Sequence, residues 1–187
     1  MENGVFSDYE VRKLVFKFAE GDAIEMPCVG SVEEELEVLT ITKNCRGVPK
    51  KVRSRGKGTG TLKISAHVPN ALLDKLYSMT TEGFKKGVRA YGQDSLHQEF
   101  VLTADVFDED GDEKLKAYPR CLVQSNLSRK TENGAEEVAE MELEISIMPD
   151  DNGNGVYEAI VSEIEDSTLK TDWLTKFTPS MVKELSA

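Results

Sequence analysis

Cysteine, histidine and long apolar runs are all scarce in this chain of 187 residues. Nowhere do about 18 apolar residues run together, and the start, with Glu2, has no apolar stretch typical of a signal peptide. We therefore expect neither secretion by signal peptide nor a membrane-spanning segment. The three cysteines, Cys28, Cys45 and Cys121, are widely spaced and form no CxxC pair, so we expect reduced thiols in a cytoplasm.

Basic residues are fewer than acidic residues over the whole chain, but many of them are concentrated in one segment. The chain has 34 acidic and 23 basic residues, for a net charge of −11. Residues 43–63 contain eight Lys or Arg and no Asp or Glu, which leaves −19 for the rest of the chain. Charge divided in this way favours association between copies as much as binding of an external partner.

Alternation of apolar and polar residues with period two dominates the chain and predicts strands with one buried face. It occurs at residues 14–18, 24–28, 62–68, 100–107 and 141–147, and a further strand is expected at 156–164. The pattern favours antiparallel pairing. The fold class that we predict is mainly β, an antiparallel β-sandwich or barrel.

Helices are expected in two places only. Helical spacing of leucines predicts one flanking helix at about 70–79, with Asn70 as its N-cap. The C-terminal part from Thr171 is predicted to be a linker followed by a short helix that begins at Pro179. We treat residues 1–187 as a single domain, with an N-terminal strand or arm at 1–31 and a C-terminal extension at 166–187.

Residues 43–58 show no clear periodicity and predict a long basic loop between two strands. We consider three roles for it: a nucleic-acid arm, a segment that docks on a neighbouring copy, and a solvated loop. Between Lys43 and Lys63 there is no aromatic residue to stack on bases, which weakens the first role. Eight like charges repel one another there, so we expect the loop to be mobile until it meets an acidic surface.

Motifs for metal binding and catalysis are incomplete. The acidic turns at 108–112 and 150–155 resemble parts of an EF-hand loop, but its final glutamate is replaced by Ala117 and Val161, respectively. The only histidines, His67 and His97, have no catalytic motif beside them. We therefore expect no enzyme activity, no cofactor and no metal, although a hydrolase that uses paired carboxylates stays open as an alternative.

Glutamates alternate with other residues along two of the predicted strands, so that each strand presents acidic side chains on one face. Such a face is usually solvated, but it would also suit the wall of a channel. These glutamates are Glu33, Glu35, Glu37, Glu140, Glu142 and Glu144.

The order and spacing of several segments resemble those of the major tail proteins, or tail tube proteins, of long-tailed bacteriophages of Gram-positive hosts and related prophage tails. The similar stretch runs from about Val32 to Ile164 and includes GTGTLKISAHVP, NALLDKLYSM, AYGQDS, EFVLTADVFDEDGDEKLKAYPRCLV and MELEISIMPDDNGNGVYEAIV. The resemblance implies a β-sandwich flanked by a helix, assembled into hexameric rings that stack into a tube. It also implies a place in the virion tail, assembly in the host cytoplasm, and contact with the tape measure, tail terminator and distal tail proteins. Genomic DNA would be a transient cargo.

Within such a tube, the charge pattern suggests separate roles for its acidic and basic parts. A wall of carboxylates repels DNA phosphates, so we expect the six glutamates to line the lumen. The basic loop is expected between rings, where it would pair with acidic residues such as Asp108, Asp110 and Asp112. A nucleic-acid-binding β-barrel that uses residues 43–63 is the main alternative, and a flexible tail is not distinguished from a contractile or bactericidal one. The residues expected between rings are Arg46, Lys50, Lys51, Arg53, Arg55 and Lys57.

Overall fold

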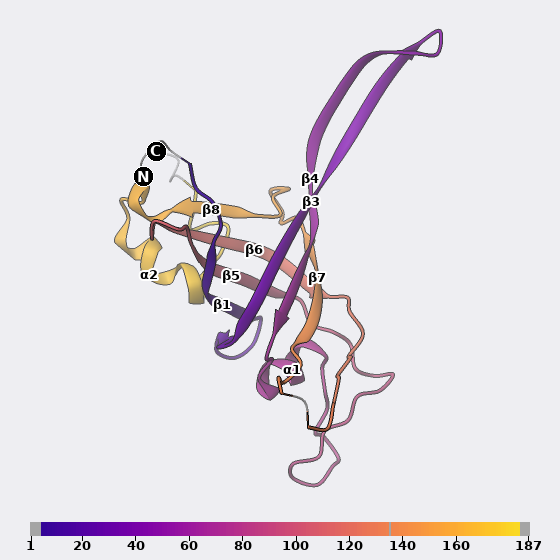
Figure 1. Ribbon diagram of the computed structural model, residues 1–187, viewed down its shortest axis with the longest axis vertical. Helices are drawn as coiled ribbons and strands as arrows, with labels where there is room; N and C mark the ends of the chain where they lie inside the picture. Colours follow the sequence, from indigo (N-terminus) through magenta and orange to yellow (C-terminus); the bar gives the residue numbers. More distant parts are fainter. Residues whose placement is uncertain (1–4, 135, 184–187) are drawn as a thin grey trace.

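A computed structural model describes residues 5–134 and 136–183 and contains eight strands and two α-helices (Figure 1). The strands are antiparallel and follow the order β2-β1-β5-β6-β7-β4-β3, with β8 paired to β6 outside this path. This confirms the predicted fold class. The first four residues of the expected N-terminal strand and the last four of the expected C-terminal extension lie outside the described residues. The strands are β1 (Glu10–Phe18), β2 (Ile24–Glu25), β3 (Val29–Cys45), β4 (Val48–Ala66), β5 (Phe100–Phe107), β6 (Glu113–Val123), β7 (Met141–Met148) and β8 (Tyr157–Ile160).

The sheet folds over into two layers, and strand β6 takes part in both because its two halves pair with different strands. Lys114–Ala117 of this strand pair with β8, whereas Arg120–Val123 pair with β7. The main core lies between the layers and receives alternate side chains from β1, β4, β5, β6 and β7, which explains the period-two pattern of the sequence. Helix α1 (Asn70–Leu76) adds Leu72, Leu73 and Leu76 to this core.

The two helices differ in detail from the sequence prediction. Helix α1 ends at Leu76, and its N-cap is Pro69, so Asn70 is its first helical residue and provides no side-chain cap. Helix α2 (Ser167–Lys176) occupies the expected linker, whereas residues 179–182 form turns. The predicted start at Pro179 was therefore wrong. The carboxylate of Asp166 accepts hydrogen bonds from the N–H groups of Thr168 and Leu169, and this cap fixes the true start of α2.

Helix α2 covers the outer face of β6 and forms a second, smaller core there. Trp173 and Phe177 pack against Leu115 and Ala117, which point away from the main core. The indole N–H of Trp173 also donates to the backbone oxygen of Lys116 at 3.1 Å. A large aromatic residue with a satisfied polar group thus holds the helix on the sheet.

The most visible departure from the prediction is the segment expected to be a long loop. Residues 43–58 form the outer part of a hairpin in which β3 and β4 continue far beyond the rest of the sheet (Figure 1). Only Arg46 and Gly47 connect the strands, and both have positive φ, 51° and 78°. Two such residues match the twist of a two-residue hairpin turn, for which glycine is favoured. Mutual repulsion of the basic residues does not prevent the pairing, which extends to Cys45 and Val48.

Candidate assembly surfaces

The predicted acidic ladders meet on one exposed face of the sheet, formed by β3, β4 and β7. In this face Glu33 lies opposite Lys63, and Lys63 lies opposite Glu144 on its other side. Glu142 and Glu35 occupy neighbouring rows with the same orientation. We call this surface, with its six predicted glutamates, the acidic face. Sequence alternation predicted the ladders but could not reveal that β4 lies between them and joins them.

Two lysines reduce the charge of the acidic face without cancelling it. Lys63 lies 3.8 Å from Glu33, and Lys57 donates to Glu37 at 2.8 Å. The hydrogen bond from Lys57, together with one from Thr59, lowers the pKa of Glu37. These pairs are exposed and hold their partners weakly. The remaining glutamates leave the face acidic.

Glu140 belongs to the same face but lies just before β7. Its carboxylate lies so close to Gly30 of β3 that a Cβ at Gly30 would come within 2.6 Å of Glu140 carboxylate atoms. A hollow of about 730 Å³ opens beside it, between the acidic face and residues 125–130 and 139–140. Five of the glutamates thus lie on strands and the sixth just before β7, and Glu33, Glu142 and Glu144 line the hollow together with Glu140.

The outer part of the β3–β4 hairpin, residues 38–58, is here called the basic hairpin. It contains seven Lys or Arg residues and no Asp or Glu. Directly opposite residues of an antiparallel pair share a face, so the register divides these side chains into two sets. One face carries Leu39, Ile41, Lys43, Lys51, Arg53 and Arg55; the other carries Val38, Thr40, Thr42, Val52 and Ser54.

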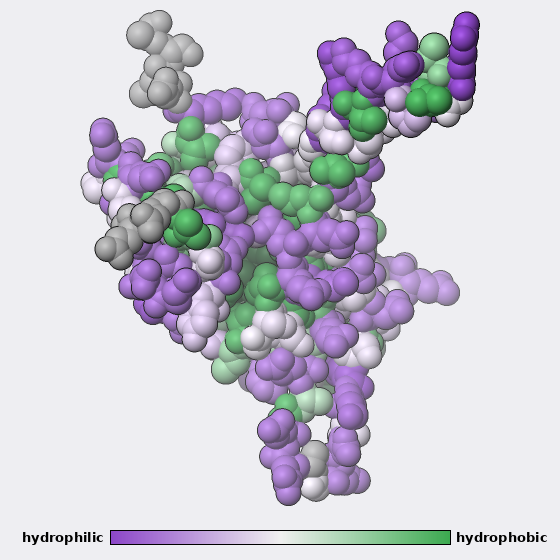
Figure 2. All heavy atoms as spheres, turned by 45° about the horizontal axis from the view of Figure 1, so that its top comes forward, coloured by the Kyte–Doolittle hydropathy of each residue, from purple (hydrophilic) through white to green (hydrophobic). Residues whose placement is uncertain are grey.

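Several apolar side chains of the basic hairpin are exposed to solvent. Val38, Ile41, Val48 and Val52 are exposed by 63%, 56%, 56% and 58%. Figure 2 shows the hairpin standing clear of the body, with apolar patches among its hydrophilic residues. Both strand edges are open there, because β4 pairs with β7 only between Gly60 and Ala66. An open, partly apolar ribbon of this kind is a site for association with another chain.

The predicted basic residues therefore lie on one projecting element, although not on the expected loop. Arg46 occupies the turn, and Lys51, Arg53 and Arg55 share one face of β4. Lys57 lies at the base of the hairpin, where it binds Glu37 of the acidic face. The sixth predicted residue, Lys50, lies next to the register shift near the turn.

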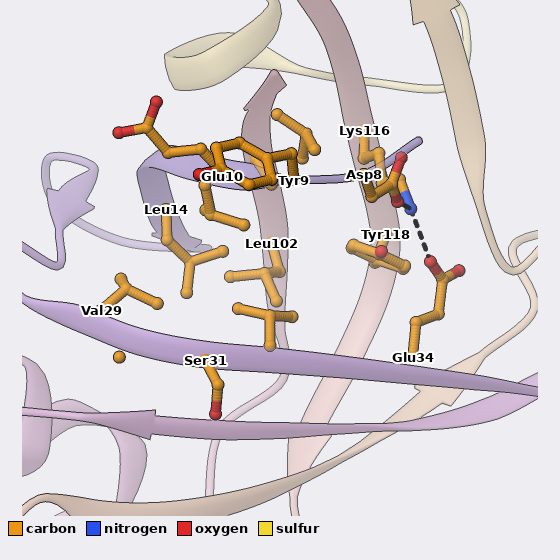
Figure 3. A pocket seen from close by; sticks show the side chains of 15 residues that line it. Asp8, Tyr9, Glu10, Leu14, Val29, Ser31, Glu34, Leu102, Lys116 and Tyr118 are labelled. Carbon is orange, nitrogen blue, oxygen red and sulfur yellow. Dashed lines mark hydrogen bonds and ion pairs between the residues drawn. The ribbon is translucent and has the colours of Figure 1, made fainter. Parts of the chain in front are cut away.

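A slot between β1 and β3 is a feature that the sequence reading missed (Figure 3). Its volume is about 620 Å³, and its floor includes Leu102 of β5 and Tyr118 of β6. At one end Asp8 precedes β1, and Glu34 of β3 lies across from it. The slot marks the place where the two ends of the curled sheet approach without pairing.

Lys116 is the central charged group at this end of the slot. Its side chain is only 9% exposed, and its Nζ atom lies 2.6 Å from Asp8, 2.9 Å from Glu34 and 3.3 Å from Glu158. Burial alone would lower the pKa of Lys116, but the hydrogen bonds to Asp8 and Glu34 outweigh it and raise the pKa above its ordinary value. Lys116 therefore stays charged and ties the N-terminal segment to β3 and β8. Lys114 and Lys116 alternate with Leu115 and Ala117, so the sequence predicts a polar face here and contains no signal for this cluster.

The acidic turns that resemble EF-hand fragments are explained by hydrogen bonds within the turns. Asp108 accepts from the N–H groups of Asp110 and Asp112, and Asp150 accepts from those of Asn152 and Asn154. Among the described residues, His, Cys, Asp and Glu form no cluster of three or more suited to a metal ion. Within the same residues, no helix has the length and apolar character needed to cross a membrane.

Comparisons with known proteins give limited similarity. No protein-family model and no curated protein sequence matches the chain. Two cryo-EM structures of the anti-feeding prophage contain chains that are similar in structure, one in its tube-terminating cap and one in its baseplate. Both alignments have a TM-score of 0.47 and cover 86% of this chain, with 10% sequence identity over 98% of the cap chain and 12% over 99% of the baseplate chain.

Proposed function

We propose that this chain is a non-enzymatic structural subunit that assembles with copies of itself into stacked hexameric rings, forming a tail tube through which DNA passes. The separation of charge carries the proposal. The basic hairpin projects from the body with seven positive charges and no negative ones, while six glutamates gather on a face of the same sheet. One end of each copy is thus suited to contact an acidic surface of the next. The resemblance in segment order to tail tube proteins supplies the ring architecture.

The acidic face has a physical reason to line the tube. Duplex DNA carries about one negative charge per 1.7 Å of its axis, and a wall rich in Lys or Arg would retain it. A wall with six glutamates and two paired lysines per subunit would repel the phosphates. In this proposal DNA is a passing cargo, and the other tail proteins meet the tube at its ends.

Removing the projecting part of the hairpin tests the proposed assembly. In the test variant, residues 46–57 are deleted, which removes the turn and the outer part of β4, makes residues 38–45 the new connection, and leaves the core residues of β3 and β4 in place. We expect subunits that still unfold cooperatively, with less strand signal in their circular dichroism spectrum, and that no longer sediment as polymers, whereas the full chain forms rings or tubes in negative-stain micrographs. Polymers of normal length from the deletion variant would contradict the proposed role of the hairpin.

A nucleic-acid-binding role is the second candidate, because the major groove of DNA admits a two-stranded β-ribbon. The basic hairpin is such a ribbon, with Lys43, Lys51, Arg53 and Arg55 on one face. If this role were correct, the monomer would retard a DNA duplex at 50 mM salt and release it steeply by 200 mM. Rings without retardation of DNA would favour the structural role.

A further inference from the structure

The slot between β1 and β3 has walls that are suited to take up an extended chain. Within the described residues, β3 pairs with β4 alone, and β1 pairs with β2 only at Val15 and Phe16. The facing edges, residues 10–13 of β1 and 29–36 of β3, therefore have backbone groups directed toward the slot rather than toward a neighbouring strand. Open strand edges of this kind bind an added strand through main-chain hydrogen bonds.

The two ends of the slot differ in chemistry. Apolar side chains of Leu14, Leu102 and Val106 line its interior, and Asp8 and Glu34 lie at one end, whereas the Glu10 carboxylate pairs with Arg12 on the other side. The acidic β5–β6 turn, residues 108–112, follows directly, because Glu10 pairs with Phe107. At this end the three carboxylates of Asp8, Glu34 and Glu158 face the two lysines Lys114 and Lys116.

The basic hairpin has the complementary chemistry and lies in line with the slot. Residues 29–34 of β3 form a wall of the slot, and the same strand continues into the hairpin at residue 38. At about 3.4 Å per residue, residues 38–45 extend about 27 Å and the wall about 20 Å. Copies related by a shift along β3 would thus bring the hairpin of one to the slot of the next.

We propose that the slot receives the basic hairpin of a second copy, which adds its open edge to β1 or β3 and directs its positive residues to the acidic end. The proposal rests on the proposed assembly and specifies the surface that the hairpin contacts. The contact joins two different surfaces, so it repeats from copy to copy, and with a shift along β3 in each step it forms an open filament and does not close into a ring. The slot would therefore set the axial connection between rings.

A disulfide between copies tests this contact and uses Cys45, the natural cysteine next to the hairpin turn. One copy carries C28S and keeps Cys45. A second copy, with a tag that changes its mass, carries C28S, C45S and Glu10→Cys at the slot. The matched control replaces Glu10→Cys by Glu142→Cys on the acidic face; both glutamates are exposed. Cys121 is common to all copies and buried, and burial raises the pKa of its thiol, so it stays unreactive.

The mixed copies are assembled, checked by negative-stain microscopy, oxidised and resolved on a non-reducing gel. We expect the mixed disulfide with Glu10→Cys to exceed that with Glu142→Cys by at least tenfold. Equal yields, or a higher yield with Glu142→Cys, in samples that contain tubes would overturn the slot contact and leave the proposed function intact. The absence of any polymer for the unmodified chain would overturn both.

Discussion

Asp105 provides a sharp test of the energetics of this fold. It is buried on β5, and its Oδ1 atom has no hydrogen-bond partner among the described residues. Burial, followed by repulsion from Glu113, raises the pKa of Asp105 to about 6, and Lys13 and Arg12 oppose this rise only in part. We expect Asp105→Asn, which removes the ionisable group but keeps its shape, to stabilise the protein at neutral pH.

The magnitude follows from the difference in pKa between the folded and unfolded states. A rise from 3.8 to about 6 corresponds to about 3 kcal/mol. The folded state binds the proton more tightly, so this stabilisation is present below pH 3.8 and is lost as the pH rises through about 6. Asp105→Asn should therefore be more stable than the unmodified protein by up to about 3 kcal/mol at pH 7.5 and similar to it at pH 4.

Urea denaturation followed by circular dichroism at pH 4, 5, 6 and 7.5 measures this difference. With an m-value of about 2 kcal/mol/M, the midpoint at pH 7.5 should rise by about 1.5 M. Asp94→Asn, at an exposed position, is the control and should change the midpoint little at any pH. A difference for Asp105→Asn that does not vary with pH, or a loss of stability at pH 7.5, would refute the reasoning.

Three further changes test the packing around the candidate surfaces. Lys116→Met leaves the half-buried Glu34 and the exposed Asp8 and Glu158 without their cation and should lower the free energy of unfolding by about 2 kcal/mol, against less than about 1 kcal/mol for the exposed Lys63→Met, both measured in urea. Gly58→Ala places a Cβ 2.5 Å from a backbone oxygen at a φ of +74°, so its melting temperature should fall well below that of Gly47→Ala, which has a similar φ but open space around it. Trp173→Ala should destabilise the protein by about 3–5 kcal/mol by emptying the core under α2; a loss below about 1 kcal/mol in urea would contradict that packing.

Local patterns predicted most strands of this fold, and the failures have identifiable causes. Alternation predicted β5 and β7 because each has one face in the main core. Residues 43–58 of the basic hairpin escaped detection because neither of its faces is buried, so their sequence shows no contrast between apolar and polar positions. Arg46 and Gly47 were the available signal, but arginine is not a residue that this turn usually favours.

The candidate surfaces were predictable only in part, because they depend on which strands are neighbours. The glutamate ladders could be read from the sequence, but the position of Lys63 between two of them comes from strand pairing. The slot depends on an even longer-range feature, the approach of β1 and β3 from opposite ends of the sheet. Lys116 and its three carboxylates, which come from separate segments, could not be grouped by spacing along the chain.

The most direct measurement for the proposed function is a cryo-EM reconstruction of the polymer formed by the purified protein. The account predicts stacked rings of six copies whose inner wall carries Glu33, Glu35, Glu142 and Glu144, with the basic hairpins connecting one ring to the next. A polymer in which these glutamates face outward, or in which the inner wall is basic, would contradict it.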